Sequence, residues 1–188
     1  MVWNVPNTLT LLRIALIPVL VVVFYLPLAW SNLASTAVFG LAALTDWFDG
    51  YLARKLGQSS PFGAFLDPVA DKLIVAVALV MLVQANPKWW FVIPAAVIVG
   101  REIAISALRE WMAEIGERTQ VAVSFIGKIK TTAQMIALLL LLYRQPLWGF
   151  PTNEVGVLLL YVAAILTLWS MVMYLKAAWP MLSAPSND

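Results

Sequence analysis

The chain has 188 residues, of which 62% are hydrophobic and only 12% are charged, and its formal net charge is +2. A soluble domain carries about a quarter charged residues, so this composition indicates one integral membrane domain spanning residues 1–188. The small net charge gives no indication of a nucleic-acid partner. The chain has no Cys and no His, which excludes thiolate and imidazole nucleophiles and Cys- or His-ligated metal sites.

Six hydrophobic segments follow one another, and we expect each to form a transmembrane helix of an all-α protein. A short amphipathic lead-in, from Trp3 to Leu12, precedes the first segment, which is too long for a signal-peptide core. The expected segments are 14–30, 34–56, 61–84, 89–110, 124–143 and 154–176. The middle four continue into charged sequence, which is typical of helices that line a polar cavity. Short buried helices of a soluble protein are the alternative, but the chain has too little polar surface to cover them.

The basic residues predict the orientation of the helices. Six spans place both termini on one side of the membrane, and only Lys88 and Arg144 of the 12 basic residues fall on the other side. By the positive-inside rule, the side with both termini faces the cytoplasm. Trp30, Trp89 and Trp148 lie in the loops of the opposite side, where tryptophans anchor helices at the membrane interface.

Four aspartates flank the short turn between the second and third segments. Asp46 and Asp49 precede the turn, and Asp67 and Asp71 follow it. A glycine after a basic helix end and a Ser-Pro pair at the next helix start mark the turn. Because a helix rises about 1.5 Å per residue, both pairs lie about 10 to 16 Å from the turn. Spacings of three and four residues place each pair on one helix face.

These carboxylates repel one another unless positive charge lies between them. Arg54 and Lys72 offer part of that charge, so a purely structural ion-pair network is one interpretation. One or two divalent cations satisfy the charge and the oxygen-only ligands better, and Mg²⁺ or Mn²⁺ is the expected choice. Carboxylates inside a membrane are costly and are usually functional, which favours the metal site.

The stretch Asp46-x2-Asp49-Gly50-x2-Ala53-Arg54-x8-Gly63-x3-Asp67-x3-Asp71 resembles the signature of the CDP-alcohol phosphatidyltransferases at every fixed position. Three less diagnostic stretches, 4–10, 100–102 and 127–132, are similar to members that use sn-glycerol 3-phosphate as acceptor. The resemblance covers nearly the whole chain. It implies the six-helix CDP-alcohol phosphatidyltransferase fold, a homodimer, and a place in the bacterial cytoplasmic (inner) membrane with the active site facing the cytoplasm.

The resemblance also implies a role for individual residues. Two metal ions at the pyrophosphate of CDP-diacylglycerol would be bound by Asp46, Asp49, Asp67 and Asp71. Asp71 would also be the catalytic general base that takes the proton of the acceptor hydroxyl. The CDP-lipid would contact Thr10, Gly50, Arg54, Ser60 and Gly63. The implied reaction is direct transfer of the phosphatidyl group to sn-glycerol 3-phosphate, with release of CMP.

A phosphate-bearing acceptor needs cationic groups close to the metal ions. The candidates are Arg101 in the fourth segment and Lys128 and Lys130 at the start of the fifth. Ordinary snorkelling and positive-inside charge are the alternative interpretation.

Sister enzymes with inositol phosphate, serine or phosphatidylglycerol as acceptor are the main alternative function. A neutral or zwitterionic acceptor would not need three converging basic residues. A prenyltransferase would be expected to have a longer chain with two separated Asp clusters. A transporter would be expected to carry polar residues through the whole membrane depth, whereas this chain places its acids, apart from Glu154, on one side.

Overall fold

The computed structural model describes residues 5–56, 61–114 and 125–182, and their regular structure is helical apart from one isolated bridge between Leu147 and Phe150. The helices are α1 (Val5–Tyr25), α2 (Ser31–Leu56), α3 (Pro61–Ala85), α4 (Trp89–Glu114), α5 (Phe125–Tyr143) and α6 (Thr152–Leu182). Each predicted segment corresponds to one helix, most of them within a few residues at each end. The prediction of an all-α fold is therefore confirmed.

The first helix differs most from its predicted bounds. Residues 5–12, expected to form a lead-in, run without a break into the apolar part of α1, and the helix already ends at Tyr25. Pro27 explains the early end, because the residue before a proline is disfavoured in the helical conformation. A short hydrogen-bonded turn then leads into α2. Polar side chains in the first half of α1 are therefore held by the same rigid helix as its apolar half.

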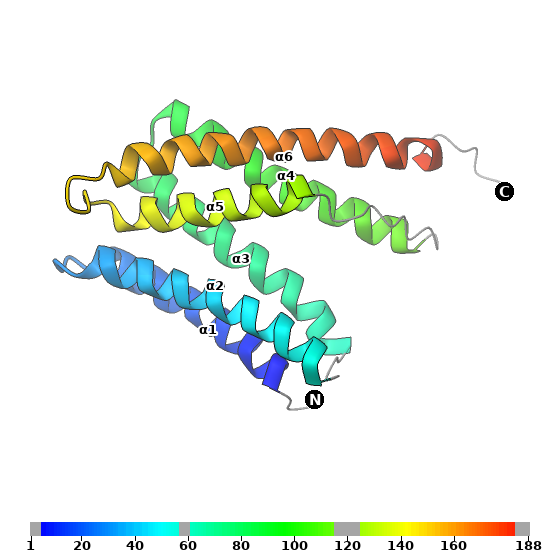
Figure 1. Ribbon diagram of the computed structural model, residues 1–188, viewed down its shortest axis with the longest axis horizontal. Coiled ribbons are helices and arrows are strands. Elements are labelled where there is room, and N and C mark those ends of the chain that lie inside the picture. The colour runs from blue at the N-terminus through cyan, green and yellow to red at the C-terminus, as the bar shows by residue number, and fades with distance from the viewer. Residues whose placement is uncertain (1–4, 57–60, 115–124, 183–188) are drawn as a thin grey trace.

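The bundle is elongated, and α3 runs diagonally between two pairs of helices (Figure 1). α1 packs beside α2, α5 packs beside α6, and α4 contacts α6. The connections after α1, α3 and α5 gather at one end, on the left of Figure 1, which we call the loop end (residues 26–30, 86–88 and 144–151). α1 begins and α6 ends toward the opposite side of the bundle, which we call the terminal end.

Every helix contributes to one buried apolar core. Fully buried side chains include Leu20, Phe39, Ala78, Ile98, Leu138 and Leu160, one from each helix in chain order. Large apolar side chains also cover the outside of the bundle, and Val22, Ile103 and Ile165 are each more than half exposed. An apolar exterior of this kind is unfavourable in water and is suited to lipid.

Three helices of the described chain are long and apolar enough to cross a membrane, within Asn7–Tyr25, Trp89–Met112 and Thr152–Lys176. A shorter apolar stretch occupies Ile129–Tyr143 in α5. α2 and α3 carry the aspartates, which interrupts their apolar character. α2 and α3 are two of the four helices that the sequence assigns to a polar cavity.

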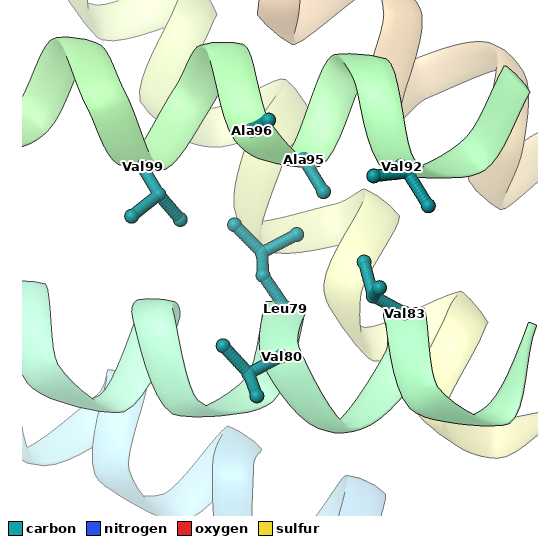
Figure 2. Close-up of a pocket in the computed structure, with 7 residues that line it drawn as sticks. All are labelled: Leu79, Val80, Val83, Val92, Ala95, Ala96 and Val99. Carbon is teal, nitrogen blue, oxygen red and sulfur yellow. The ribbon is translucent and has the colours of Figure 1, made fainter. Parts of the chain in front are cut away.

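An apolar cavity of about 250 Å³ lies between α3 and α4 (Figure 2). Its walls are Leu79, Val80 and Val83 on α3, and Val92, Ala95, Ala96 and Val99 on α4. None of these side chains carries a polar group, so the cavity offers no ligand to a metal ion or a phosphate. The predicted polar site therefore has to be found elsewhere in the bundle.

Candidate active site

Two of the predicted metal ligands converge on one buried arginine of α1. The Nη1 atom of Arg13 lies 3.3 Å from Oδ1 of Asp46 on α2 and donates a hydrogen bond to Oδ1 of Asp71 on α3. The Arg13 side chain is 1% exposed, whereas the two carboxylates are 41% and 42% exposed. Three helices thus bring opposite charges together at the edge of the core. This geometry is consistent with the prediction that aspartates of the second and third segments lie close together.

A second contact of the same kind lies one turn away. The hydroxyl of Thr10, which is fully buried, donates a hydrogen bond to Oδ1 of Asp67. Thr10 and Arg13 are three residues apart on α1, and Asp67 and Asp71 are four apart on α3, so each pair shares one helix face. Asn7, one further turn back on α1, is also buried. A polar stripe on α1 therefore faces the aspartates of α3.

A polar cavity of about 140 Å³ opens beside these carboxylates. It is lined by residues of α2, α3, α4 and α5: Asp46, Asp71, Lys72, Val75, Glu102, Lys130, Thr131, Gln134 and Met135. Carboxylates predicted to bind metal and a lysine predicted to bind the acceptor phosphate therefore share one small cavity. This juxtaposition of Asp46 and Asp71 with Lys130 is the central feature of the site.

Glu102 connects the basic side chains around the cavity. Lys130 donates from Nζ to Oε1 of Glu102 at 2.7 Å, and Nη1 of Arg101 donates to the same oxygen at 3.0 Å. Nη2 of Arg101 donates to Oγ of Ser170 on α6 at 3.1 Å. Lys130 and Glu102 line the cavity, while the Arg101 guanidinium packs toward α6 and lies 5.9 Å from the Tyr174 ring. Arg101 therefore reaches the cavity through Glu102.

Several predicted site residues cannot be compared with the structure at the level of side chains. Asp49, Gly50 and Arg54 lie in the last turns of α2, and Lys128 lies in the first turn of α5, but their side chains are outside the described set. Ser60 lies outside the described residues altogether. Gly63 is in the first turn of α3 and is buried.

Arg13 is the site residue that sequence reasoning missed, because it was counted only as one of the positive-inside charges. Its signal is the spacing of Asn7, Thr10 and Arg13, three residues apart in an otherwise apolar helix. That spacing puts three polar side chains along one face. Such a face in a membrane helix points toward the interior of the bundle, because polar groups in lipid are unfavourable.

The donor set of the site fits a hard divalent cation. Asp46 and Asp71 both approach a single Arg13 nitrogen, so the two carboxylates already face a common point of positive charge. Carboxylate oxygens are the ligands that Mg²⁺ and Mn²⁺ prefer. Among the described side chains, no three carboxylates come together as one metal-binding group. The side chain of Asp49, the fourth predicted metal ligand, lies outside the described side chains.

The sequence matches the family described as CDP-alcohol phosphatidyltransferase over residues 3–169. That match covers well over half of the chain, and the chain belongs to this family. It is therefore an all-α membrane enzyme, a phosphatidyltransferase whose helices carry the apolar surface described above.

Curated relatives agree with this assignment. The chain is 58% identical to the CDP-diacylglycerol–glycerol-3-phosphate 3-phosphatidyltransferases of Salmonella choleraesuis and Shigella flexneri. It is 57% identical to the protein of that name from Escherichia coli strain K12. Each of these similarities covers 95% of this chain and 96% of the relative. The resemblance found from the aspartate signature is confirmed.

Proposed function

We propose that the protein transfers the phosphatidyl group of CDP-diacylglycerol to sn-glycerol 3-phosphate, giving phosphatidylglycerophosphate and CMP. The observation that carries the proposal is the cavity in which Asp46 and Asp71 face Lys130. One side of this cavity suits a cation-bound pyrophosphate, and the other suits the phosphate of the acceptor. The names of the relatives with 57% and 58% identity support the same pair of substrates.

In this proposal Asp46, Asp49, Asp67 and Asp71 hold two Mg²⁺ or Mn²⁺ ions. When bound, the ions neutralise charge on the pyrophosphate. Thr10 holds Asp67 through its hydrogen bond, and Arg13 holds Asp46 and Asp71, so α1 fixes the directions of three carboxylates. Preorganised charge of this kind is the main contribution that a protein makes to phosphoryl transfer.

Asp71 takes the proton of the acceptor hydroxyl in the proposed reaction. The acceptor oxygen then forms a bond to the lipid-side phosphorus, and the bond from that phosphorus to the oxygen of CMP breaks. CMP leaves with the electron pair of the broken bond. The chain has no Cys and no His, so direct displacement needs no covalent intermediate on either residue type. Asp71 lines the cavity, and this position supports its proposed role as the general base.

The acceptor phosphate is assigned to Lys130, with Arg101 and Lys128 as further contributors. Glu102 accepts from both Lys130 and Arg101, so it orients two cations and neutralises one of their charges. One positive charge of the group Lys130, Arg101 and Glu102 is then left uncompensated, and it attracts a dianionic phosphate. The CDP-lipid is assigned to Thr10, Gly50, Arg54, Ser60 and Gly63.

We further propose six transmembrane spans, a homodimer, and the bacterial inner membrane with both termini in the cytoplasm. The arrangement in Figure 1 supports the common side of the termini, because α1 begins and α6 ends toward the same end of the bundle. The distribution of basic residues supports the cytoplasmic assignment of that end. Resemblance to the family supports the homodimer.

The identity of the acceptor is tested by offering several acceptors to the purified protein with Mg²⁺ and CDP-diacylglycerol. We expect CMP release with sn-glycerol 3-phosphate and only background release with serine, inositol phosphate or phosphatidylglycerol. The measurement is CMP by chromatography together with the lipid product by mass. Equal CMP release with another acceptor would assign the chain to a sister activity.

Replacing Lys130 with Gln is expected to raise the KM for glycerol 3-phosphate by about tenfold or more, with a smaller effect on kcat. The reason is that the lysine supplies a charge-assisted bond to the acceptor phosphate. Steady-state kinetics at saturating CDP-diacylglycerol measure the changes in KM and in kcat separately. Lys176→Gln is the matched control, because Lys176 is an exposed lysine on α6 outside the cavity. An unchanged KM with a lower melting temperature would assign Lys130 a purely structural role with Glu102.

A further inference from the structure

The loop end carries exposed tryptophans and a cavity that the proposed reaction does not use. Trp89 and Trp148 are strongly exposed there, at 74% and 99%, and Trp30 is about half exposed. Exposed tryptophans collect where a membrane protein meets the lipid headgroups. The loop end therefore lies at headgroup level, and none of its residues lines the aspartate cavity.

A second partly polar cavity, of about 210 Å³, opens at this end. Its apolar wall includes Leu82, Phe91 and Leu141, and its polar groups are Asn86, Arg144 and Asn153. The cavity is several times larger than the roughly 30 Å³ share of one water molecule, so it accommodates a group of several heavy atoms. Four elements meet there: α3, α4, the end of α5 and the start of α6.

Arg144 lies in this cavity with one guanidinium donor unsatisfied. Its backbone φ is +59°, a left-handed conformation that is uncommon for residues other than glycine. Its guanidinium carbon lies 4.0 Å from the centre of the Phe24 ring. Its Nη2 atom is buried and donates no hydrogen bond within the described chain. Burial lowers the pKa of Arg144, although nearby Tyr25 opposes this.

A buried guanidinium donor without an acceptor is unfavourable, because an arginine side chain stays protonated and the contact with the Phe24 ring gives the Nη2 group no hydrogen-bond acceptor. An anion in the cavity would provide the missing acceptor. Asn86 and Asn153 add amide groups that hydrogen-bond to phosphate oxygens or to hydroxyls. Neither of these side chains, nor any other that lines the cavity, is a carboxylate, so an ammonium group would find no charged partner.

We propose that this cavity binds the phosphodiester headgroup of an acidic phospholipid, with Arg144 as its anchor and Asn86 and Asn153 as hydrogen-bonding neighbours. The absence of a carboxylate from the lining favours a headgroup with net negative charge over a zwitterionic one. The position at headgroup level favours a lipid over a free phosphate ion. Binding here joins α1, through Phe24, to α3, α4, α5 and α6, and so stabilises the loop end of the bundle.

The test is the melting temperature of the full-length protein in a neutral detergent, titrated with phosphatidylglycerol, phosphatidylcholine or inorganic phosphate. A ligand that binds only the folded state raises the melting temperature. We expect phosphatidylglycerol to do so at lower concentration than phosphatidylcholine, and inorganic phosphate to have no comparable effect. Equal protection by phosphatidylcholine would overturn the acidic headgroup, and equal protection by inorganic phosphate would identify the free ion as the ligand.

Two variants and one control locate the effect. Arg144→Gln is expected to raise the half-saturating phosphatidylglycerol concentration by about tenfold, as expected for loss of one charge-assisted bond. Asn153→Asp places a negative charge in the cavity, which repels an acidic headgroup and is expected to raise the same concentration. Because an acid near the start of α6 is favourable for the helix, this variant tests the proposal if Arg144→Gln does not fold. Lys88→Gln, which removes a cation outside the cavity lining, is expected to respond like the unmodified protein. A normal response of both Arg144→Gln and Asn153→Asp would overturn the proposal.

Discussion

Replacing Asp71 with Asn is expected to lower kcat by about three orders of magnitude or more while CDP-diacylglycerol binding is largely kept. A general base contributes about 10²- to 10⁴-fold, and the amide also removes one anionic ligand from the proposed metal site. Asn has nearly the same shape, and its amide oxygen still accepts the hydrogen bond from Arg13. Loss of proton transfer, rather than loss of the fold, therefore dominates the effect.

Two measurements separate chemistry from binding in this variant. CMP release under saturating substrates reports kcat, and the shift of melting temperature with CDP-diacylglycerol reports binding. Glu110→Gln is a suitable control, because Glu110 is an exposed carboxylate on the same half of the protein but outside the cavity lining. Turnover by Asp71→Asn within tenfold of the unmodified enzyme would exclude Asp71 as the base.

The α2–α3 hairpin shows how far sequence reasoning reaches. A helix has a fixed rise, so counting residues from the turn gives the depth of each aspartate, and Asp46 and Asp71 do share one ion-pair partner and one cavity. Short turns also restrict neighbouring helices to antiparallel packing. Position along the helix was therefore predictable for Asp46 and Asp71, although α2 and α3 contact each other little and α1 connects them.

The partner of those aspartates was not predictable in the same way. Counting residues gives the position along a helix, but it does not say which other helix lies across from a given face. α1 packs against both α2 and α3, and only this tertiary arrangement brings Arg13 between their carboxylates. Arg101 illustrates the same limit: the sequence predicts it as a ligand of the acceptor phosphate, but its guanidinium packs toward Ser170 on α6 and does not line the cavity.

Replacing Arg13 with Gln is expected to reduce turnover by about a hundredfold and to lower the melting temperature more in EDTA than in excess Mg²⁺. Without the guanidinium, Asp46 and Asp71 lose their common buried partner, and their mutual repulsion is no longer compensated. Breaking a buried ion pair costs about 3–5 kcal/mol, and the partial exposure of both carboxylates reduces this to about 2 kcal/mol. A divalent cation at the same carboxylates would restore part of that loss by supplying positive charge.

The comparison of the two buffers distinguishes Arg13 as a holder of the aspartates from Arg13 as a packing residue. A packing defect lowers the melting temperature equally in EDTA and in Mg²⁺, because it does not depend on the charge of the carboxylates. Loss of charge compensation gives a difference between the buffers, and the double variant with Asp46→Asn should show a smaller difference, since one repelling charge is gone. Lys176→Gln, which removes an exposed positive charge on α6, should behave like the unmodified protein in both buffers. An identical loss in both buffers would mean that Arg13 supports the fold without organising the carboxylates for a cation.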